Sequence, residues 1–265
     1  MMRRPVLFAI AATAAALVTA CATSPLGRKQ FILISDDSIN AQGVASYQQM
    51  QKEMPASKDG RINGYVNCIS NAITAQVPTL REKGELAVPA AWEVTVFASD
   101  DVNAFALPGG KIGVFTGLLK VASTQDQLAA VIGHEVSHVL ARHSAERASA
   151  DLPAQLGGAV ASMYGVGQLY GMGVNALFLL PYSRSHESEA DLLGLDLMAM
   201  AGFDPRASIT LWQNMAKASG GQKPPEMLST HPSDETRMHD LNARMKVALD
   251  LYVTAKGQGR NPKCG

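Results

Sequence analysis

One short pattern in the sequence has the residue types and spacing for metal chemistry: His134-Glu135-Val136-Ser137-His138. Residues four apart on an α-helix share a face, so His134 and His138 can bind one ion. Glu135 lies beside the first histidine, where its carboxylate can reach a water on that ion and act as a general base. The pattern predicts a hydrolytic zinc site, against the simpler alternative of two ordinary helix histidines.

A catalytic zinc site needs a third protein ligand. His143 is about 180° around a continuous helix from His134, so it is expected to point away from the metal. Glu146 would lie about 12 Å along the helix axis from His138, which is too far for bonds of about 2 Å. The third ligand is therefore expected from another element.

The remaining acidic cluster is Glu187-Ser188-Glu189-Ala190-Asp191. Glu187 and Asp191 share a helix face, whereas Glu189 is turned roughly 200° from Glu187. We predict Glu187 as the third ligand and Asp191 as the acceptor for the N–H of a ligand imidazole. The alternative is that these acidic residues form a solvated helix face.

The elements that must position these residues follow from periodicity and capping signals. Trp92 to Ala98 alternates as a strand does, and Pro108-Gly109-Gly110 predicts a tight bend between two further extended segments. These segments predict a small antiparallel sheet. Apolar residues at spacings of three and four, with caps such as Ser35 and Thr124, predict helices. The predicted helices cover 36–54, 62–77, 124–147, 185–201, 205–218 and 233–255.

The N-terminus predicts a targeting segment over 1–20, with Arg3 and Arg4 before an apolar run. Val18-Thr19-Ala20-Cys21 resembles a bacterial lipobox, so we predict lipidation at Cys21, with an ordinary secretory signal as the alternative. Equal numbers of basic and acidic residues, 23 of each, argue against a nucleic-acid partner. Cys68 and Cys264 are expected either to pair in an exported compartment or to remain separate thiols.

The two-part metal pattern, HEVSH followed by Glu187 to Asp191, resembles peptidase family M48, a group of zincin-like gluzincins. Asn103 to Gly110, and Thr230-His231-Pro232 with Arg237, resemble its bacterial periplasmic lipoprotein members. The resemblance implies one Zn²⁺ per chain. It also implies that 103–116 can bind a substrate backbone as an added strand. Finally, it implies a catalytic role for His231, either in stabilising the oxyanion or as a resting-state ligand.

The predicted fold class is α+β, mainly α, with a gluzincin domain and a small sheet beside the active-site helix. The predicted boundaries are 1–20 for the signal, 21–30 for a lipidated tether, 31–256 for the peptidase domain and 257–265 for a loose tail. Within the domain, the uncharged stretch 152–183 is predicted as a lid or membrane-proximal segment.

The predicted function is zinc-dependent hydrolysis of unfolded or misassembled cell-envelope proteins. In this prediction the catalytic residues are Glu135, Asp191 and His231, and the protein is held by its lipid anchor on the periplasmic face of the bacterial outer membrane. The alternative is a membrane-tethered chaperone or assembly factor that binds the same unfolded proteins without hydrolysing them.

Overall fold

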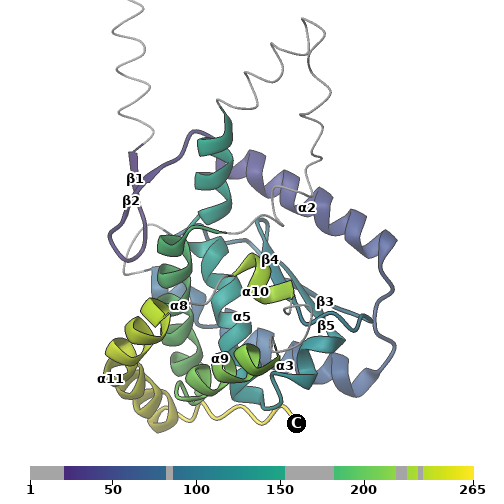
Figure 1. The fold of residues 1–265 in the computed structure, drawn as a ribbon, viewed down its shortest axis with the longest axis vertical. Coiled ribbons are helices and arrows are strands. Elements are labelled where there is room, and N and C mark those ends of the chain that lie inside the picture. Colours follow the sequence, from purple (N-terminus) through teal and green to yellow (C-terminus); the bar gives the residue numbers. More distant parts are fainter. Residues whose placement is uncertain (1–20, 82–85, 153–181, 219–225, 232–234) are drawn as a thin grey trace, which may run out of the picture.

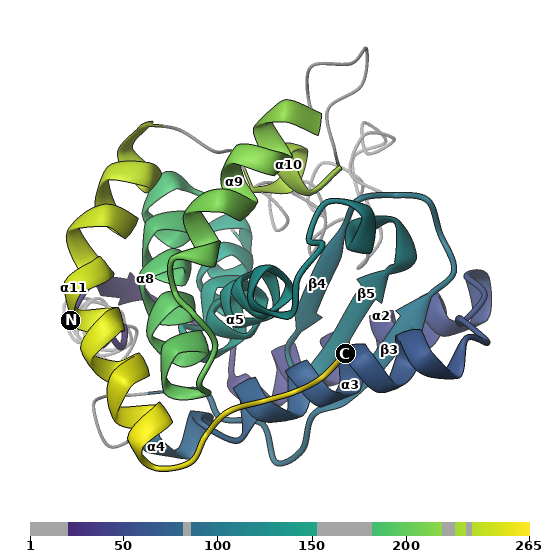
Figure 2. The same ribbon diagram turned by 90° about the horizontal axis from the view of Figure 1, so that it is seen from below.

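The computed structural model describes residues 21–81, 86–152, 182–218, 226–231 and 235–265. Helix α5 (Gln125–Leu140) runs through the middle of the molecule, between strand β4 and helix α8 (Figures 1 and 2). It begins where the Thr124 side chain accepts a hydrogen bond from the backbone N–H of Gln127. From Gln127 to its end every residue of α5 is buried, so the helix can carry a site that excludes bulk water.

The sheet has three strands, β3 (Glu93–Phe97), β4 (Ala104–Leu107) and β5 (Lys111–Phe115), in the order β3-β5-β4. The β4–β5 pair is an antiparallel hairpin, as predicted. Strand β3, however, pairs in parallel with β5, so the sheet is mixed and not wholly antiparallel. The chain after β3 crosses to the far side of β5, which leaves β4 at the sheet edge beside α5.

The backbone conformation of the turn between β4 and β5 explains why Gly109 and Gly110 occupy it. Gly109 and Gly110 have φ angles of 82° and 75°, a left-handed conformation that favours glycine. A Cβ atom on Gly110 would lie 2.1 Å from the carbonyl oxygen of Ala91, so the close approach also excludes a side chain. Both the backbone conformation and the close packing therefore require glycine at this turn.

Helix α3 (Gly60–Thr74) packs against α5 and β3. Its predicted apolar stripe is buried at Val66, Ile69 and Ile73. Burying side chains of this size contributes about 1.5–3 kcal/mol each. The stripe belongs to the main core, which is formed between the sheet, α5 and α8.

Helix α8 (Arg184–Met200) packs along α5, and helix α11 (Glu235–Gly257) covers the outer side of α8 (Figure 2). Ser183 caps the start of α8, and the chain turns away from its end at Gly202, where φ is 90°. Shorter helical elements are α4 (Val77–Arg81), η1 (Thr116–Lys120), α9 (Ala207–Ala218) and α10 (Glu226–Thr230).

The N-terminal residues do not form the predicted tether. Strands β1 (Cys21–Thr23) and β2 (Lys29–Phe31) form an antiparallel hairpin instead. Arg28 in its turn forms ion pairs with Glu146 and Glu189, so this segment is part of the folded domain. Helix α2 (Asp36–Glu53) follows, capped by Ser35 as predicted.

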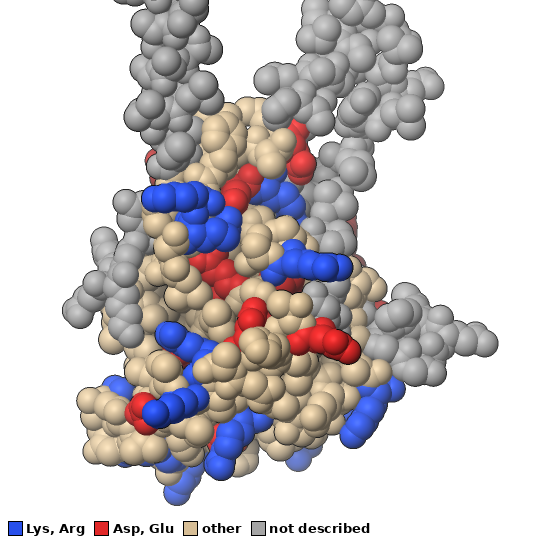
Figure 3. Space-filling model, turned by 60° about the vertical axis from the view of Figure 1, so that its left-hand side comes forward, with Lys and Arg blue, Asp and Glu red and all other residues tan. Residues whose placement is uncertain are grey.

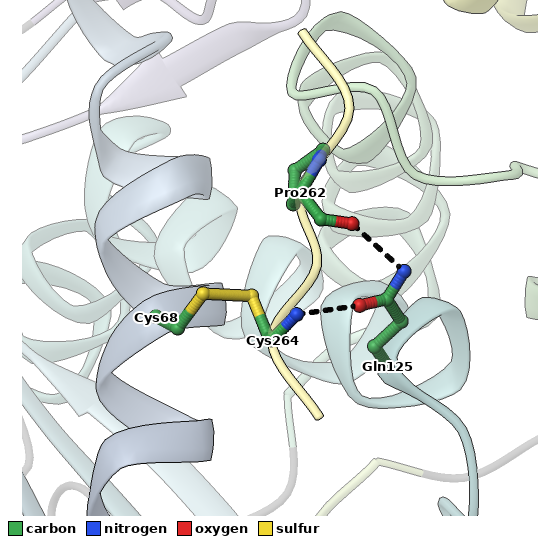
Figure 4. Close-up of a disulfide and its surroundings, with 4 residues drawn as sticks. All are labelled: Cys68, Gln125, Pro262 and Cys264. Carbon is green, nitrogen blue, oxygen red and sulfur yellow. Dashed lines mark hydrogen bonds between the residues drawn. A yellow bond between two sulfur atoms is a disulfide. The ribbon is translucent and has the colours of Figure 1, made fainter.

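The C-terminal tail is fastened and not loose. Cys264 forms a disulfide with Cys68 of α3 (Figure 4). The Gln125 side chain donates to the carbonyl oxygen of Pro262 at 3.1 Å and accepts from the backbone N–H of Cys264 at 3.0 Å. Because Gln125 is the first residue of α5, the tail links α3 to the start of the central helix.

Two predictions concern the surroundings of the domain. The predicted lid lies almost wholly at 153–181, outside the described residues. Within the described ranges, no helix combines the length and apolarity that crossing a bilayer requires.

On the face drawn in Figure 3, acidic and basic side chains are interspersed among uncharged residues, so the described part of that face presents a mixed charge pattern.

Candidate metal centre

Four buried side chains from three parts of the chain converge at one point. His134 and His138 come from α5, Glu187 from the first turn of α8, and His231 from the residue after α10. One ligand atom from each lies within 4.8 Å of all the others. In the described part of the chain this is the one such group of histidine, cysteine and acidic residues that could hold a metal ion.

The spacing of these atoms fits a tetrahedral shell. Nε2 of His134 lies 3.0 Å from Nε2 of His138 and 3.4 Å from Oε2 of Glu187. Nε2 of His138 lies 3.5 Å from Oε1 of Glu187. Four ligands about 2.05 Å from one ion would be separated by about 3.3 Å. The ring nitrogens and the carboxylate therefore surround a position suited to a small cation.

His231 completes this group. Its Nδ1 lies 3.3 Å from Nε2 of His134 and 3.0 Å from Oε1 of Glu187, so it faces the position shared by the other ligands. Its other nitrogen, Nε2, lies 3.4 Å from Oε1 of Glu135. His231 thus stands between the metal position and the predicted general base.

Asp191 and Arg237 support His134. Oδ1 of Asp191 lies 2.9 Å from Nδ1 of His134, the contact expected of an acceptor for a ligand imidazole N–H. Arg237 donates to both carboxylate oxygens of Asp191, at 2.6 and 2.8 Å, and lies 3.0 Å from Glu187. Its guanidinium group lies over the Trp212 ring at 4.2 Å. Burial alone would raise the pKa of Asp191, but Arg237 and His134 lower it, so the carboxylate stays charged.

Glu135 lies on α5 next to edge strand β4, and only 3% of its surface is exposed. Burial raises the pKa of Glu135, which makes the carboxylate a stronger base than an exposed glutamate. The backbone N–H of Ala106 in β4 acts in the opposite direction to burial and lowers this pKa. Among the described residues, none donates a hydrogen bond to Oε1 of Glu135. That buried oxygen can therefore accept a proton without losing a hydrogen bond, although Nε2 of His231 lies 3.4 Å away.

The metal helix is shorter than predicted. Helix α5 ends at Leu140, and Arg142 takes a left-handed conformation with φ of 58° before a second helical segment over 143–152. The sequence has neither glycine nor proline at this turn, so no local signal marks it. His143 was predicted to point away from the metal because it lies half a turn around a continuous helix from His134, and the helix is not continuous there. His143 is nevertheless not one of the four converging ligands.

His143 and Glu189 are site residues that the sequence interpretation missed. Nδ1 of His143 lies 2.9 Å from Nδ1 of His138, and Nε2 of His143 lies 3.2 Å from Oε2 of Glu189. Burial lowers the pKa of His143 to about 4, so its ring is neutral near pH 7. Tyr182 stacks on the His138 ring with centroids 4.1 Å apart. Of these side chains, His143 contacts the His138 ring at Nδ1, the nitrogen that does not face the metal position.

The structure shows where the three cysteines lie. Cys68 and Cys264 are joined, with their Cα atoms 5.5 Å apart. The backbone of Cys21 begins β1, opposite Phe31 in β2, and its lipidation stays a prediction.

The sequence of this chain is similar to those of known peptidases. The profile of peptidase family M48 matches residues 70–245. Mitochondrial metalloendopeptidase OMA1 of Schizosaccharomyces pombe is 44% identical over 153 residues, covering 57% of this chain and 45% of that protein. The mitochondrial OMA1 metalloendopeptidase of Bos taurus is 33% identical over 246 residues, covering 86% and 45%. The β-barrel assembly-enhancing protease of Yersinia pestis is 28% identical over 246 residues, covering 88% and 49%. The chain thus spans about half the length of these relatives.

These relatives overturn the predicted localisation. A lipoprotein on the periplasmic face of a bacterial outer membrane is contradicted, because five relatives that are 32–45% identical to this chain are mitochondrial proteins. The bacterial β-barrel assembly-enhancing proteases also match, at 27–28% identity. The predicted localisation depended on the short pattern from Val18 to Cys21.

Proposed function

Because this chain belongs to peptidase family M48, we propose that it is a zinc-dependent endopeptidase that hydrolyses peptide bonds in unfolded or misassembled proteins. The observation that carries the proposal is the convergence of His134, His138 and Glu187 on one position, with the base Glu135 next to it on the same helix. Three protein ligands and an adjacent carboxylate are the components of a hydrolytic zinc site.

The donor set favours zinc over other divalent ions. Imidazole nitrogens with one carboxylate at tetrahedral spacing suit Zn²⁺, whereas Mg²⁺ and Ca²⁺ take six or more oxygen ligands. Asp191 accepts the second N–H of His134, which leaves Nε2 of that ring available to the metal. The residues present therefore fit one Zn²⁺ per chain.

The chain's own residues account for the proton transfers. A bound zinc ion would polarise the scissile carbonyl group and lower the pKa of the attacking water to about 7. Glu135 takes the proton of that water on its free oxygen and returns it to the leaving amine. No covalent intermediate with the protein is needed.

Strand β4 is proposed to align the substrate. It is an edge strand, paired with β5 on one side only, and it contacts α5, the helix that carries Glu135. A peptide that adds to this edge by backbone hydrogen bonds would run past the base. Backbone recognition depends little on side chains and requires an extended peptide, so it favours unfolded substrates.

His231 is proposed to be a resting-state ligand. Its Nδ1 occupies the fourth ligand position, which a catalytic zinc site keeps open for water or substrate. In this arrangement His231 must move before the reaction, and its position after short helix α10 allows the movement without disturbing α5 or α8. The alternative role, stabilising the oxyanion, is available to the same side chain once it has moved.

The relatives' names support a role in protein quality control. The Yersinia pestis relative is named for enhancing β-barrel assembly, and a peptidase that removes misassembled chains suits that description. We therefore propose misassembled envelope or membrane-associated proteins as the substrate class.

Metal analysis and a cleavage assay test the proposal. Purified protein is expected to contain one zinc ion and to cleave unfolded casein, with activity lost on chelation and restored by zinc. Glu135→Gln is expected to keep zinc and fold while losing cleavage by at least about 100-fold. A fully active Glu135→Gln protein would overturn the peptidase assignment.

The same variant separates hydrolysis from binding. If Glu135→Gln rescues a strain that lacks this protein as well as the wild type does, the biological role is that of a chaperone that binds unfolded proteins. Failure to rescue, with normal protein levels and zinc content, supports the peptidase.

A further inference from the structure

The two histidine ligands on α5 are supported in different ways. Nδ1 of His134 faces a carboxylate, Asp191, which is the usual partner of a metal-binding histidine. Nδ1 of His138 faces another imidazole instead, since Nδ1 of His143 lies 2.9 Å away. All three histidines are buried, with at most 3% of their surface exposed. The contact between His138 and His143 is therefore shielded from water, and the two rings must satisfy each other's nitrogens.

Two nitrogens at this distance must share exactly one proton. If His138 binds the metal through Nε2, its Nδ1 carries the ring proton and donates it to His143. Nδ1 of His143 is then the acceptor, so the proton of that ring is on Nε2. From Nε2 it is donated to Oε2 of Glu189, 3.2 Å away. Each polar atom in the series from His138 to Glu189 is satisfied in this one arrangement.

Glu189 is held by the N-terminal hairpin. Its Oε1 accepts a hydrogen bond from the Ser24 hydroxyl, and its Oε2 lies 2.9 Å from Nε of Arg28. These two donors from the hairpin orient the carboxylate as an acceptor for the N–H of His143.

The hairpin also holds the segment that carries His143. Gln30 donates to the carbonyl oxygen of Ala141, at the turn after α5, at 2.7 Å. Arg28 forms a two-pronged ion pair with Glu146, with both contacts at 2.7 Å. Because α5 ends at this turn, the direction of the following segment depends on these contacts more than on helix geometry.

We propose that His143 and Glu189 are positioning residues that orient the His138 imidazole for metal binding, and that Arg28 of the N-terminal hairpin holds this pair in place. The proposal rests on the zinc site described under the proposed function and adds to it a connection between that site and residues 21–31. Removing such a support for a ligand typically lowers metal affinity 10–100-fold.

Zinc affinity of the folded protein is the decisive measurement. His143→Leu removes the acceptor for His138, and we expect the zinc dissociation constant, measured against a chelating dye, to rise about 10–100-fold. Glu189→Gln keeps an oxygen that can accept from His143, so its effect should be smaller. Arg28→Gln leaves both partners in place and should raise the dissociation constant least.

A matched control separates positioning from general destabilisation. Arg244→Gln removes an ion pair at 2.6 Å with buried Asp196, which lies on α8 like Glu189 but takes no part in the metal site. This variant should unfold more easily while its zinc affinity stays unchanged. The visible spectrum of the cobalt-substituted protein should change for His143→Leu and stay the same for Arg244→Gln, because it reports ligand geometry.

A measurement on the wild-type protein covers the case in which His143→Leu does not fold. In nitrogen-15 histidine spectra of the zinc-loaded protein, His138 should be protonated on Nδ1 and His143 on Nε2. A proton on Nδ1 of His143 would overturn the proposal. So would a folded His143→Leu protein that keeps wild-type zinc affinity and the wild-type cobalt spectrum.

Failure of the proposal on His143 and Glu189 can be distinguished from failure of the proposed peptidase function. If the wild-type protein binds no zinc, the metal site itself is wrong. If it binds zinc but does not cleave peptides, the peptidase assignment fails while the positioning of His138 can still be measured.

Discussion

Gly133 of α5 and Gly194 of α8 are in direct contact. A Cβ atom on Gly133 would lie 2.8 Å from the carbonyl oxygen of Gly194, and one on Gly194 would lie 2.7 Å from the backbone nitrogen of His134. The two helices that carry three of the four converging ligands therefore touch backbone to backbone, immediately beside the first ligand. This explains a glycine inside a helix, where it normally costs about 1 kcal/mol relative to alanine.

Gly194→Ala is expected to separate the two helices. The added methyl group has no room against the His134 backbone, so we expect a loss of about 1–3 kcal/mol in the free energy of unfolding, with weaker zinc binding. Urea unfolding and zinc titration measure the two effects. Gly64→Ala, at an exposed position of α3 where a Cβ meets nothing within 4 Å, is the control and should stabilise slightly. Wild-type stability and zinc affinity in Gly194→Ala would contradict the close packing described here.

Removal of the disulfide should destabilise the fold without altering the metal site. Cys68 and Cys264 are 196 residues apart, so their bond restricts the unfolded chain strongly. Replacing both with serine should lower the free energy of unfolding by about 3–5 kcal/mol, measured with urea under non-reducing conditions. Zinc affinity at 25 °C should stay unchanged, since the bond joins α3 to the tail. Equal urea midpoints for the two proteins would show that the bond does not contribute.

Metal removal should destabilise the protein by mass action. An ion that binds only the folded state adds about 2.7 kcal/mol when its free concentration is 100 times the dissociation constant. We expect a chelator to lower the thermal midpoint and added zinc to restore it. Glu187→Gln removes a ligand and should reduce this difference strongly. A midpoint that does not respond to the chelator would exclude a metal from the site.

The attachment of the hairpin should depend on pH. Burial alone would raise the pKa of Glu146, but hydrogen bonds from His186, Arg28 and Gln30 outweigh burial and hold that pKa well below its ordinary value of 4.5. The folded state therefore favours the charged carboxylate. Its stabilisation is complete above about pH 4.5 and is lost as the pH falls further.

Comparison with Glu146→Gln isolates this effect. The difference in unfolding free energy between wild type and variant should be largest near pH 7 and should shrink from pH 4.5 to pH 3, measured by urea unfolding at each pH. A difference that stays constant over this range would mean that the Glu146 charge does not hold the hairpin.

The sequence by itself determined the parts of this protein that depend on short-range geometry. The spacing of His134 and His138, and of Glu187 and Asp191, places each pair on one helix face whatever surrounds it. Capping by Ser35 and Thr124 and the left-handed backbone at Gly109-Gly110 likewise follow from the residue types at those positions. For this reason the helices, the hairpin and the principal ligand candidates were predictable.

Only the tertiary structure decided which distant groups meet. The chain turns at Arg142 without glycine or proline, and it is the contact between Gln30 and Ala141 that supports this turn. That turn brings His143 to His138, and the crossover after β3 makes the sheet mixed. Such features depend on contacts between residues far apart in the chain, and helix or strand periodicity carries no information about them.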